Sequence, residues 1–430
     1  MTPQSQFTVV AVVVAGRERA LRELLATMTS HTGVANPQNS LVPFGDFPRL
    51  HFARLVLLDD PTLEDVTTYG LPVTRLPVYL AFLGDCDGRA HETLADLAQR
   101  AADGLRRIFA HCQNFDEPLL DWMVAHDRPP AASYVNWVGR TVVQITEESG
   151  LQQALSAKVN RAPVTSRLDA QQRWRDLVQY VRGEVAAGRL VLTPPPPTRL
   201  AWRLAKCANA LGVLVGALLA LPFFIALLPF LLLRLRRHEA TDPEICPPPD
   251  AQALLELQQL EDHDITNQYT ALGSVKPGPF RRWLLTAVLM AIQFACRHVF
   301  TRGHLARVQT IHFARWLVLD AGARVMFASN YDGGHQPYMD DFINKVAWGL
   351  NIVFSNGIGW PRTDWLLRRG ARREHLFKYY QRRHQIPTEV WYQAYPGLTL
   401  IDLERNHRIR QGVEGTRMGE RAIAAWLQLL

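Results

Sequence analysis

The sequence lacks the short motifs by which many enzymes are identified. It has no glycine-rich phosphate loop ahead of a helix, no Gly-x-Ser-x-Gly elbow and no His-Glu-x-x-His pattern. Its five cysteines are scattered, and no pair has the spacing of a zinc site or a redox motif. We therefore expect neither a disulfide framework nor a structural zinc site, and the cysteines fit a reducing compartment.

Two further features are missing. No positive charge precedes the short apolar run at 9–15, so this run is expected to be a strand and not part of a signal peptide. The strands expected below also lack the aromatic-rich pattern of sheets that stack bases. Nucleic acid is therefore not an expected partner.

The composition is that of a folded protein. The chain has 430 residues, of which 48% are hydrophobic and 20% charged, enough for two or three domains with a sizeable core. The net charge is +7, and many of the cations fall in one segment: Arg362, Arg368, Arg369, Arg372, Arg373, Lys378, Arg382 and Arg383. Such a segment favours an anionic membrane surface as partner, and a solvated helix face is the open alternative.

The chain contains an internal duplication. The segment Leu50–Asp59 recurs as Ile311–Asp320, with the same His-Phe-Ala-Arg core. Farther on, the segment 84–88 corresponds to 329–333. Downstream matches pair Tyr134, Gly139 and Thr141 with Tyr392, Gly397 and Thr399. A repeat of this kind defines the folding unit before any other feature does.

Hydrophobic periodicity predicts the same element order in each copy. The first copy is expected to have strands at 8–14, 50–58, 78–83 and 134–143 and helices at 17–28 and 92–109. The second is expected to have strands at 269–275, 310–319, 324–329 and 390–402 and helices at 280–300 and 338–354. This βαββαβ order is the ferredoxin-like unit, in which two helices cover one face of a four-stranded antiparallel sheet.

The uncovered sheet face of each copy must be buried, and the other copy is the natural cover. We therefore predict an α+β fold of two ferredoxin-like repeats packed as a pseudo-twofold barrel or sandwich. The expected boundaries are 1–150 for the first repeat and 263–430 for the second, which carries a basic aromatic insertion at 360–385 and a C-terminal helix. Residues 151–262 hold a linker helix, proline-rich segments and an apolar segment.

The apolar segment at 210–233 has 24 residues without a charge, enough at about 1.5 Å per residue to cross a bilayer core. Cations flank both of its ends, so both ends are expected on the cytoplasmic face. A single crossing would separate the two repeats, and Pro222 interrupts the segment. We therefore predict a monotopic protein with a re-entrant or shallow hairpin; a soluble helical hairpin is the alternative.

The repeated strand carries a histidine and an arginine among apolar neighbours in each copy. These are His51 and Arg54 in the first and His312 and Arg315 in the second. A buried guanidinium must be paired, and the expected partners at the end of the next strand are Asp87 and Asp332. These six residues form either a structural ion pair that closes the barrel or a catalytic site.

The pattern Gly84-x-x-Asp87-Gly88, after a strand of a duplicated ferredoxin-like unit, resembles the motif of the dye-decolourising haem peroxidases, whose superfamily includes the chlorite dismutases. The second copy has Ser329 in place of the first glycine. The resemblance implies a haem, with an aspartate and a nearby arginine on its distal side and a histidine bound to the iron. The candidate axial ligands are His335, His375 and His384.

Two hypotheses of function follow. In the first, the protein is a membrane-associated, peroxidase-like oxidoreductase that acts on a hydrophobic or lipid-derived substrate, with Asp332 and Arg315 as acid–base and electrostatic groups. In the second, it is a non-catalytic membrane-bound binding or scaffold protein, and the repeated polar residues only hold the fold together. The expected partners are membrane lipid, with an anionic surface, and in the first case a small hydrophobic molecule.

Overall fold

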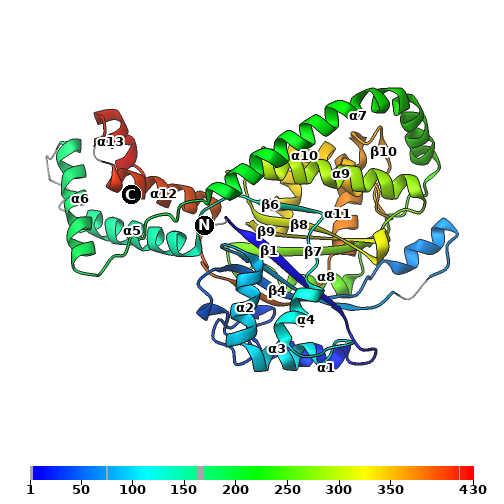
Figure 1. The fold of residues 1–430 in the computed structure, drawn as a ribbon, viewed down its shortest axis with the longest axis horizontal. Helices are drawn as coiled ribbons and strands as arrows, with labels where there is room; N and C mark the ends of the chain where they lie inside the picture. The colour runs from blue at the N-terminus through cyan, green and yellow to red at the C-terminus, as the bar shows by residue number, and fades with distance from the viewer. Residues whose placement is uncertain (1–2, 74–75, 162–168, 416) are drawn as a thin grey trace.

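Two β-sheets lie face to face at the centre of a mixed α+β protein, and helices cover their outer faces (Figure 1). The computed structural model describes residues 3–73, 76–161, 169–415 and 417–430. Part of the predicted linker, 162–168, lies outside the described residues.

The first sheet has six strands, and one face of it is covered by helices. Its order is β1 (Ser5–Val12), β5 (Tyr79–Cys86), β4 (Leu50–Leu58), β12 (Thr388–Gln393), β3 (Val34–Ala35) and β2 (Thr29–His31). Neighbours are antiparallel except β12 and β3, so the sheet is mixed. The covering helices are α1 (Glu18–Ala26), α2 (Ala90–Arg100), α3 (Ala102–Phe109) and α4 (Leu119–His126).

The second sheet has four antiparallel strands and its own helical cover. Its order is β6 (Ala132–Val135), β8 (Ile311–Leu319), β9 (Arg324–Asp332) and β7 (Thr266–Ser274). On its outer side lie α9 (Pro279–His298), α10 (His335–Phe354) and α11 (Glu374–His384) (Figure 1). The two strands of the repeated decamer, β4 and β8, were predicted to within one residue at each end.

The last strand of each copy pairs with the sheet of the other copy. β12 lies beside β4, and β6 lies beside β8. The prediction that each copy completes its own sheet was therefore wrong. The two copies offer equivalent open edges at β4 and β8, and either edge can satisfy the backbone groups of the incoming strand.

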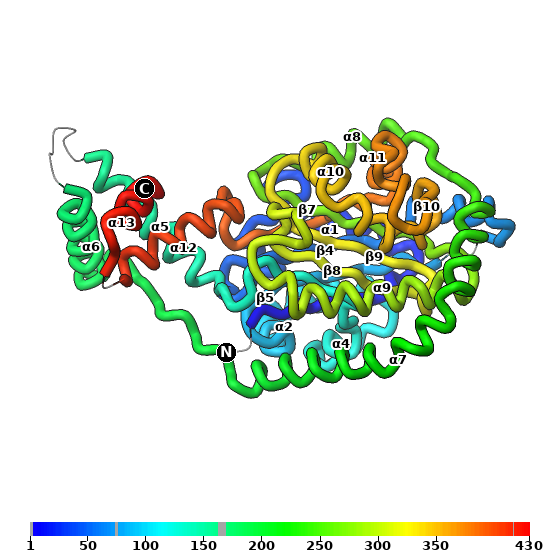
Figure 2. Tube along the Cα trace, turned by 90° about the horizontal axis from the view of Figure 1, so that it is seen from above, coloured from blue at the N-terminus to red at the C-terminus, as the bar shows by residue number. Residues whose placement is uncertain are grey.

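The predicted ends of these two strands were also wrong, because both strands stop early and a helix follows. Thr141 and Thr399 each form a capping box with the residue three positions on. They begin α5 (Val142–Asn160) and α12 (Leu400–Glu414), which pack together and project from the body with α6 (Ala170–Ala186) and α13 (Glu420–Leu427) (Figure 2). Residues 142–143 and 400–402 are thus helical.

The faces that the sheets turn toward each other form one apolar layer, as the unpaired sheet faces predicted. Met326 and Leu272 are completely buried in it. The other members are Val10, Val56, Leu58, Ala81, Leu83, Leu317, Leu319, Ala328 and Ile386. Because this layer joins the two copies, they form one body.

The apolar segment lies in α7 (Leu200–Thr241), which is one continuous helix of 42 residues. The predicted hairpin was therefore wrong. Pro222 and Pro229 lie inside the helix, and α7 is visibly bent in both views (Figures 1 and 2). A proline removes one backbone hydrogen bond and kinks a helix without ending it, which accounts for the bend.

The remaining elements are short. They are α8 (Ala251–Gln258), β10 (Thr363–Asp364), β11 (Arg368–Arg369) and four 3₁₀ turns at Phe44–Asp46, Leu63–Tyr69, Asp320–Gly322 and Gly370–Arg372. The predicted basic insertion at 360–385 thus contains β10, β11 and α11.

Candidate functional site

Arg54 reaches across from β4 to the opposite sheet. One terminal nitrogen donates to the carbonyl of Tyr269 and the hydroxyl of Thr270, each at 2.9 Å. The other donates to the carbonyl of Ser329 at 2.9 Å and to the amide oxygen of Asn330. A guanidinium thus ties β4 to both β7 and β9.

Arg315 makes the equivalent contacts from β8 to the first sheet. One terminal nitrogen donates to the carbonyl of Phe7 at 2.6 Å and to the hydroxyl of Thr8 at 2.9 Å. The other donates to the carbonyl of Gly84 at 3.1 Å and to the carboxylate of Asp85. The predicted partners were therefore wrong, because both guanidinium groups point between the sheets while Asp87 and Asp332 lie at the strand ends. We call these two reciprocal contact sets the arginine clamps.

The clamps differ at the equivalent positions 85 and 330, which hold an aspartate and an asparagine. Asn330 donates from its amide nitrogen to Asp85 at 2.9 Å. A second aspartate at 330 would bring two carboxylates together here, whereas asparagine supplies a donor. Of the two buried guanidinium groups, Arg315 contacts the carboxylate of Asp85 directly, and Arg54 is linked to it through Asn330. Burial lowers the pKa of Arg54 to about 9, with Asp85 opposing that shift and Arg315 adding to it.

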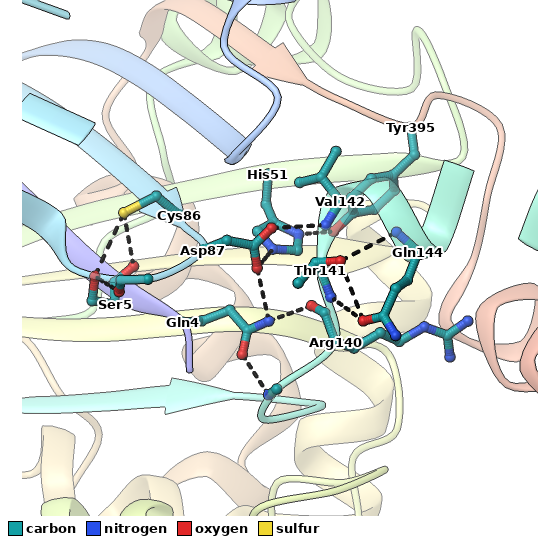
Figure 3. A network of polar contacts seen from close by, with 12 residues as sticks. Gln4, Ser5, His51, Cys86, Asp87, Arg140, Thr141, Val142, Gln144 and Tyr395 are labelled. Atoms are coloured by element: carbon teal, nitrogen blue, oxygen red, sulfur yellow. Dashed lines mark hydrogen bonds and ion pairs between the residues drawn. The ribbon is translucent and has the colours of Figure 1, made fainter. Parts of the chain in front are cut away.

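The repeated histidines bind the repeated aspartates. Asp87 contacts Nε2 of His51 at 3.0 Å and accepts from the backbone N–H of Val142 at 2.9 Å (Figure 3). The hydroxyl of Tyr395 lies 3.1 Å from Nδ1 of the same histidine, and Gln4 donates to Asp87 at 3.0 Å. A β-bulge at His51, between the pairs Leu50–Cys86 and Phe52–Asp85, breaks the simple alternation of faces.

The second copy repeats this arrangement. Nε2 of His312 lies 2.6 Å from Asp332, which accepts from the backbone N–H of Leu400 at 2.7 Å. His312 also occupies a bulge, between Ile311 and Phe313. Each aspartate therefore joins a strand histidine to the first residue of a projecting helix, α5 or α12. Negative charge is favourable at a helix N-terminus, so these contacts stabilise the fold.

One small cavity lies between the two histidine–aspartate pairs. His51, His312, Tyr395 and Arg140 are among its lining residues, and its volume is ≈ 20 Å³. Burial raises the pKa of Tyr395 well above its ordinary value. A cavity of this size holds about one water molecule. The structure thus brings both histidines together without room for an organic substrate.

The three candidate haem ligands do not converge. His335 is 3% exposed and neither ring nitrogen has a partner; burial, followed by the charges of Arg382 and Lys378, lowers its pKa to about 3. His384 is buried on α11, and His375 is exposed on the same helix. Within the described part of the chain, no three histidine, cysteine or acidic side chains form a metal-type cluster.

Of the three candidates, His384 has the hydrogen-bonding pattern of an axial ligand, with one ring nitrogen held by a backbone carbonyl and the other without a partner. Its Nδ1 lies 2.9 Å from the carbonyl of Tyr380, and its buried Nε2 has no partner. However, the adjoining cavity has a volume of ≈ 30 Å³, and a Cβ at Gly273 would lie 2.7 Å from the imidazole. Cofactor pockets measure roughly 300–1,000 Å³, so the residues around His384 do not fit a haem.

The larger grooves lie around α8 and α11, where the basic segment meets carboxylates. One groove of ≈ 850 Å³ includes Arg382 and Arg383 in its lining. Arg382 pairs with Glu261 at 2.5 Å, and Arg383 with Asp65 at 2.7 Å. Of the eight cations singled out in the sequence, six form ion pairs: Arg362, Arg369, Arg373, Lys378, Arg382 and Arg383. This segment is therefore largely neutralised.

The most unusual surface is formed by α7, which was expected to be apolar, together with α9. An 18-residue window of α7 has a mean hydropathy of 2.7 and none of it is buried. The sequence has no aspartate or glutamate at 185–238 or at 265–319, a signal that periodicity did not reveal. The first stretch contains α7 as far as residue 238, and the second contains all of α9. The surface that the two helices share is therefore cationic and apolar.

Both ends of the apolar run in α7 are fixed to α9. Asn209 lies 3.0 Å from the imidazole of His298, and the ring of His238 stacks on Phe280 at 5.3 Å. These anchors are 18 residues apart on α9, about 27 Å, but 29 residues apart on α7, about 44 Å. The extra length bows the middle of α7 away from the body. We call this part of α7, between 209 and 238, the apolar arch.

The C-terminal end of the arch is held by two carboxylates at the end of α7, which bind donors of the body. Glu239 is buried and accepts from the hydroxyl of Thr363 at 2.8 Å and the backbone N–H of Trp365 at 2.9 Å. Asp242 pairs with Arg281 at 2.5 Å and Lys276 at 3.0 Å. The end of the arch is therefore rigidly attached.

Comparison with known proteins gives no relative: no family model, curated protein or solved structure matches this chain.

Removal of the carboxylate from the arginine clamps should lower the stability of the fold strongly. Asp85→Asn would leave Arg315, which is 3% exposed, without a carboxylate, and removing one partner of a buried pair costs about 3–5 kcal/mol. Urea denaturation should show this loss in the free energy of unfolding. Asp341→Asn, which breaks an exposed helix pair with Lys345, serves as the control and should have little effect. Equal, small losses for both variants would contradict the clamp.

His335 predicts a pH dependence. Between its unfolded pKa near 6.5 and its folded pKa of about 3, the unfolded chain binds a proton that the folded chain does not. The contribution of His335 to stability is therefore complete above pH 6.5 and falls by about 1.4 kcal/mol per unit below it. From pH 7 to pH 5, wild type should lose about 2 kcal/mol more than His335→Phe in urea titrations. Parallel pH profiles would contradict this.

Proposed function

We propose that the protein is a monotopic membrane protein with a duplicated ferredoxin-like body, whose copies exchange their fourth strands, attached to the cytoplasmic face of a bilayer by the apolar arch. The arch is the single observation that carries this proposal. Leu218, Leu219 and Phe223 are 68%, 69% and 72% exposed, and contiguous apolar surface of this extent favours a membrane or protein interface.

The attachment of both ends of the arch to one body favours insertion from one side. A helix that crossed the bilayer would carry its two ends to opposite faces, but α9 binds both ends of the arch. The bend near the prolines lets the middle of the helix enter a leaflet while both ends stay at the surface. Exposed Trp283 and Trp365 near the C-terminal end suit the headgroup region, where tryptophan is enriched.

A binding or scaffold role is favoured over catalysis for the body. The residues that both copies share, Arg54 with Arg315 and His51 with His312, are engaged in contacts that hold sheets and helices together. The cavity between the histidines has room for about one water molecule. We therefore infer that the duplicated body presents its surface at the membrane as a binding or scaffold protein.

Vesicle flotation tests the arch. Leu219→Glu with Phe223→Glu places two charges on its exposed surface, where each opposes insertion, and should reduce the floated fraction at least tenfold. Val191→Glu, at a position 61% exposed outside the arch, is the matched control. Both variants should keep the wild-type melting temperature. Undiminished flotation of the double variant would contradict the proposal.

An oxidoreductase is the second candidate, and His384 with its free Nε2 is the observation in its favour. The small adjoining cavity counts against a haem.

A visible spectrum separates the two candidates. Protein purified in detergent and supplied with haem should show only the spectrum of free haem, because the cavity beside His384 is too small. A protein-bound Soret band that disappears in His384→Ala but persists in His375→Ala would favour the oxidoreductase instead.

A further inference from the structure

The two ends of the apolar arch differ in charge balance. At the C-terminal end, Glu239, Asp242 and Asp364 lie among the cations, and Arg236 pairs with Asp364 at 2.7 Å. At the N-terminal end, the described residues give no ion pair to the cations of α7 or of the adjoining end of α9 and its following loop: Arg199, Arg203, Lys206, Arg297, Arg302 and Arg307. This end therefore carries uncompensated positive charge.

The N-terminal cations gather around one histidine. His298 lies 3.0 Å from Asn209, and its pKa is lowered by burial and then by the positive charges of Lys206 and Arg297. No carboxylate opposes that shift. Two cations from different helices thus converge beside an imidazole, an arrangement that favours a bound anion, and the anion would in turn favour the charged form of His298.

The position of this cluster favours a membrane lipid as the source of such an anion. Lys206 precedes the apolar segment that begins at Ala210 by about one helical turn, so it lies at the level where an inserted arch meets the headgroups. The ammonium also lies over the ring of Trp202 at 5.4 Å, and tryptophan is enriched at that level. A lipid phosphate at this depth would be within reach of both α7 and α9.

We infer that Lys206, Arg297 and His298 form a binding site for the phosphate of an anionic phospholipid, at the N-terminal end of the arch. This inference rests on the proposed membrane attachment and adds a lipid class and a location to it. The site lies apart from the basic segment at 360–385, most of whose cations are already paired.

Flotation with two kinds of vesicle tests the site. The full-length protein should bind vesicles that contain phosphatidylglycerol more tightly than vesicles of phosphatidylcholine alone. Lys206→Gln with Arg297→Gln should weaken binding to the anionic vesicles about 25-fold, from about fivefold for each cation at an anionic surface. Binding to the neutral vesicles should stay unchanged, because the apolar arch is intact.

The matched control removes the same charge from the other end of the arch. Arg234 and Arg237 are exposed and form no ion pair among the described residues, but Glu239 on the same helix and Asp242, just beyond its end, lower the positive potential around them. Arg234→Gln with Arg237→Gln should therefore weaken binding to anionic vesicles much less. Equal weakening by the two double variants would overturn the site in favour of general attraction by net charge. Melting temperatures of both variants should match wild type.

Two further outcomes separate this inference from its foundation. If wild type floats equally with both kinds of vesicle, the phosphate site is wrong while membrane attachment stands. If it floats with neither, the proposed attachment itself fails. Inorganic phosphate, compared with chloride at equal ionic strength, should not weaken flotation; if it does, the cluster takes free phosphate and the lipid assignment is overturned.

Discussion

The arginine clamps are the constraint on which the rest of the structure depends. Arg54 and Arg315 each end among backbone carbonyls of the opposite sheet, so the sheets cannot separate without leaving buried charges unpaired. The apolar layer between the sheets and the exchanged strands also hold the two copies together. Because the two copies form one body, the chain that joins them must leave and return on one side. The bowed shape of α7 and its proposed insertion into a single leaflet follow from this.

Much of the fold could be predicted from the repeat, because repeated residues report a repeated environment. The strands β4 and β8, the burial of Arg54 and Arg315 and the facing sheets all follow from the duplicated decamer. The exchange of the last strands could not be predicted, since β4 and β8 present equivalent edges. The clamp partners were missed for a related reason: the arginines bind across the layer, whereas Asp87 and Asp332 were sought along the same sheet.

The site residues show a second limit of sequence patterns. Alternation of faces along a strand fails where a bulge inserts a residue, and His51 and His312 both occupy bulges. Their contacts with Asp87 and Asp332 therefore emerged only from the structure, as did the isolation of His335 from His384. The charge asymmetry of α7 and α9 was in contrast readable in advance, because two long stretches contain no acidic residue.

Accessibility at the two ends of α7 shows whether the arch enters the bilayer from one side. Single cysteines at Ala201 and Thr241, in a chain with Cys207→Ser and Cys246→Ser, can be probed in sealed vesicles with a maleimide that does not cross the bilayer. The remaining cysteines are buried. Because both ends of the arch are fixed to one body, both positions should react from the same side and to the same extent. Reaction of one position before the vesicles are opened, and of the other only afterwards, would contradict entry from one side.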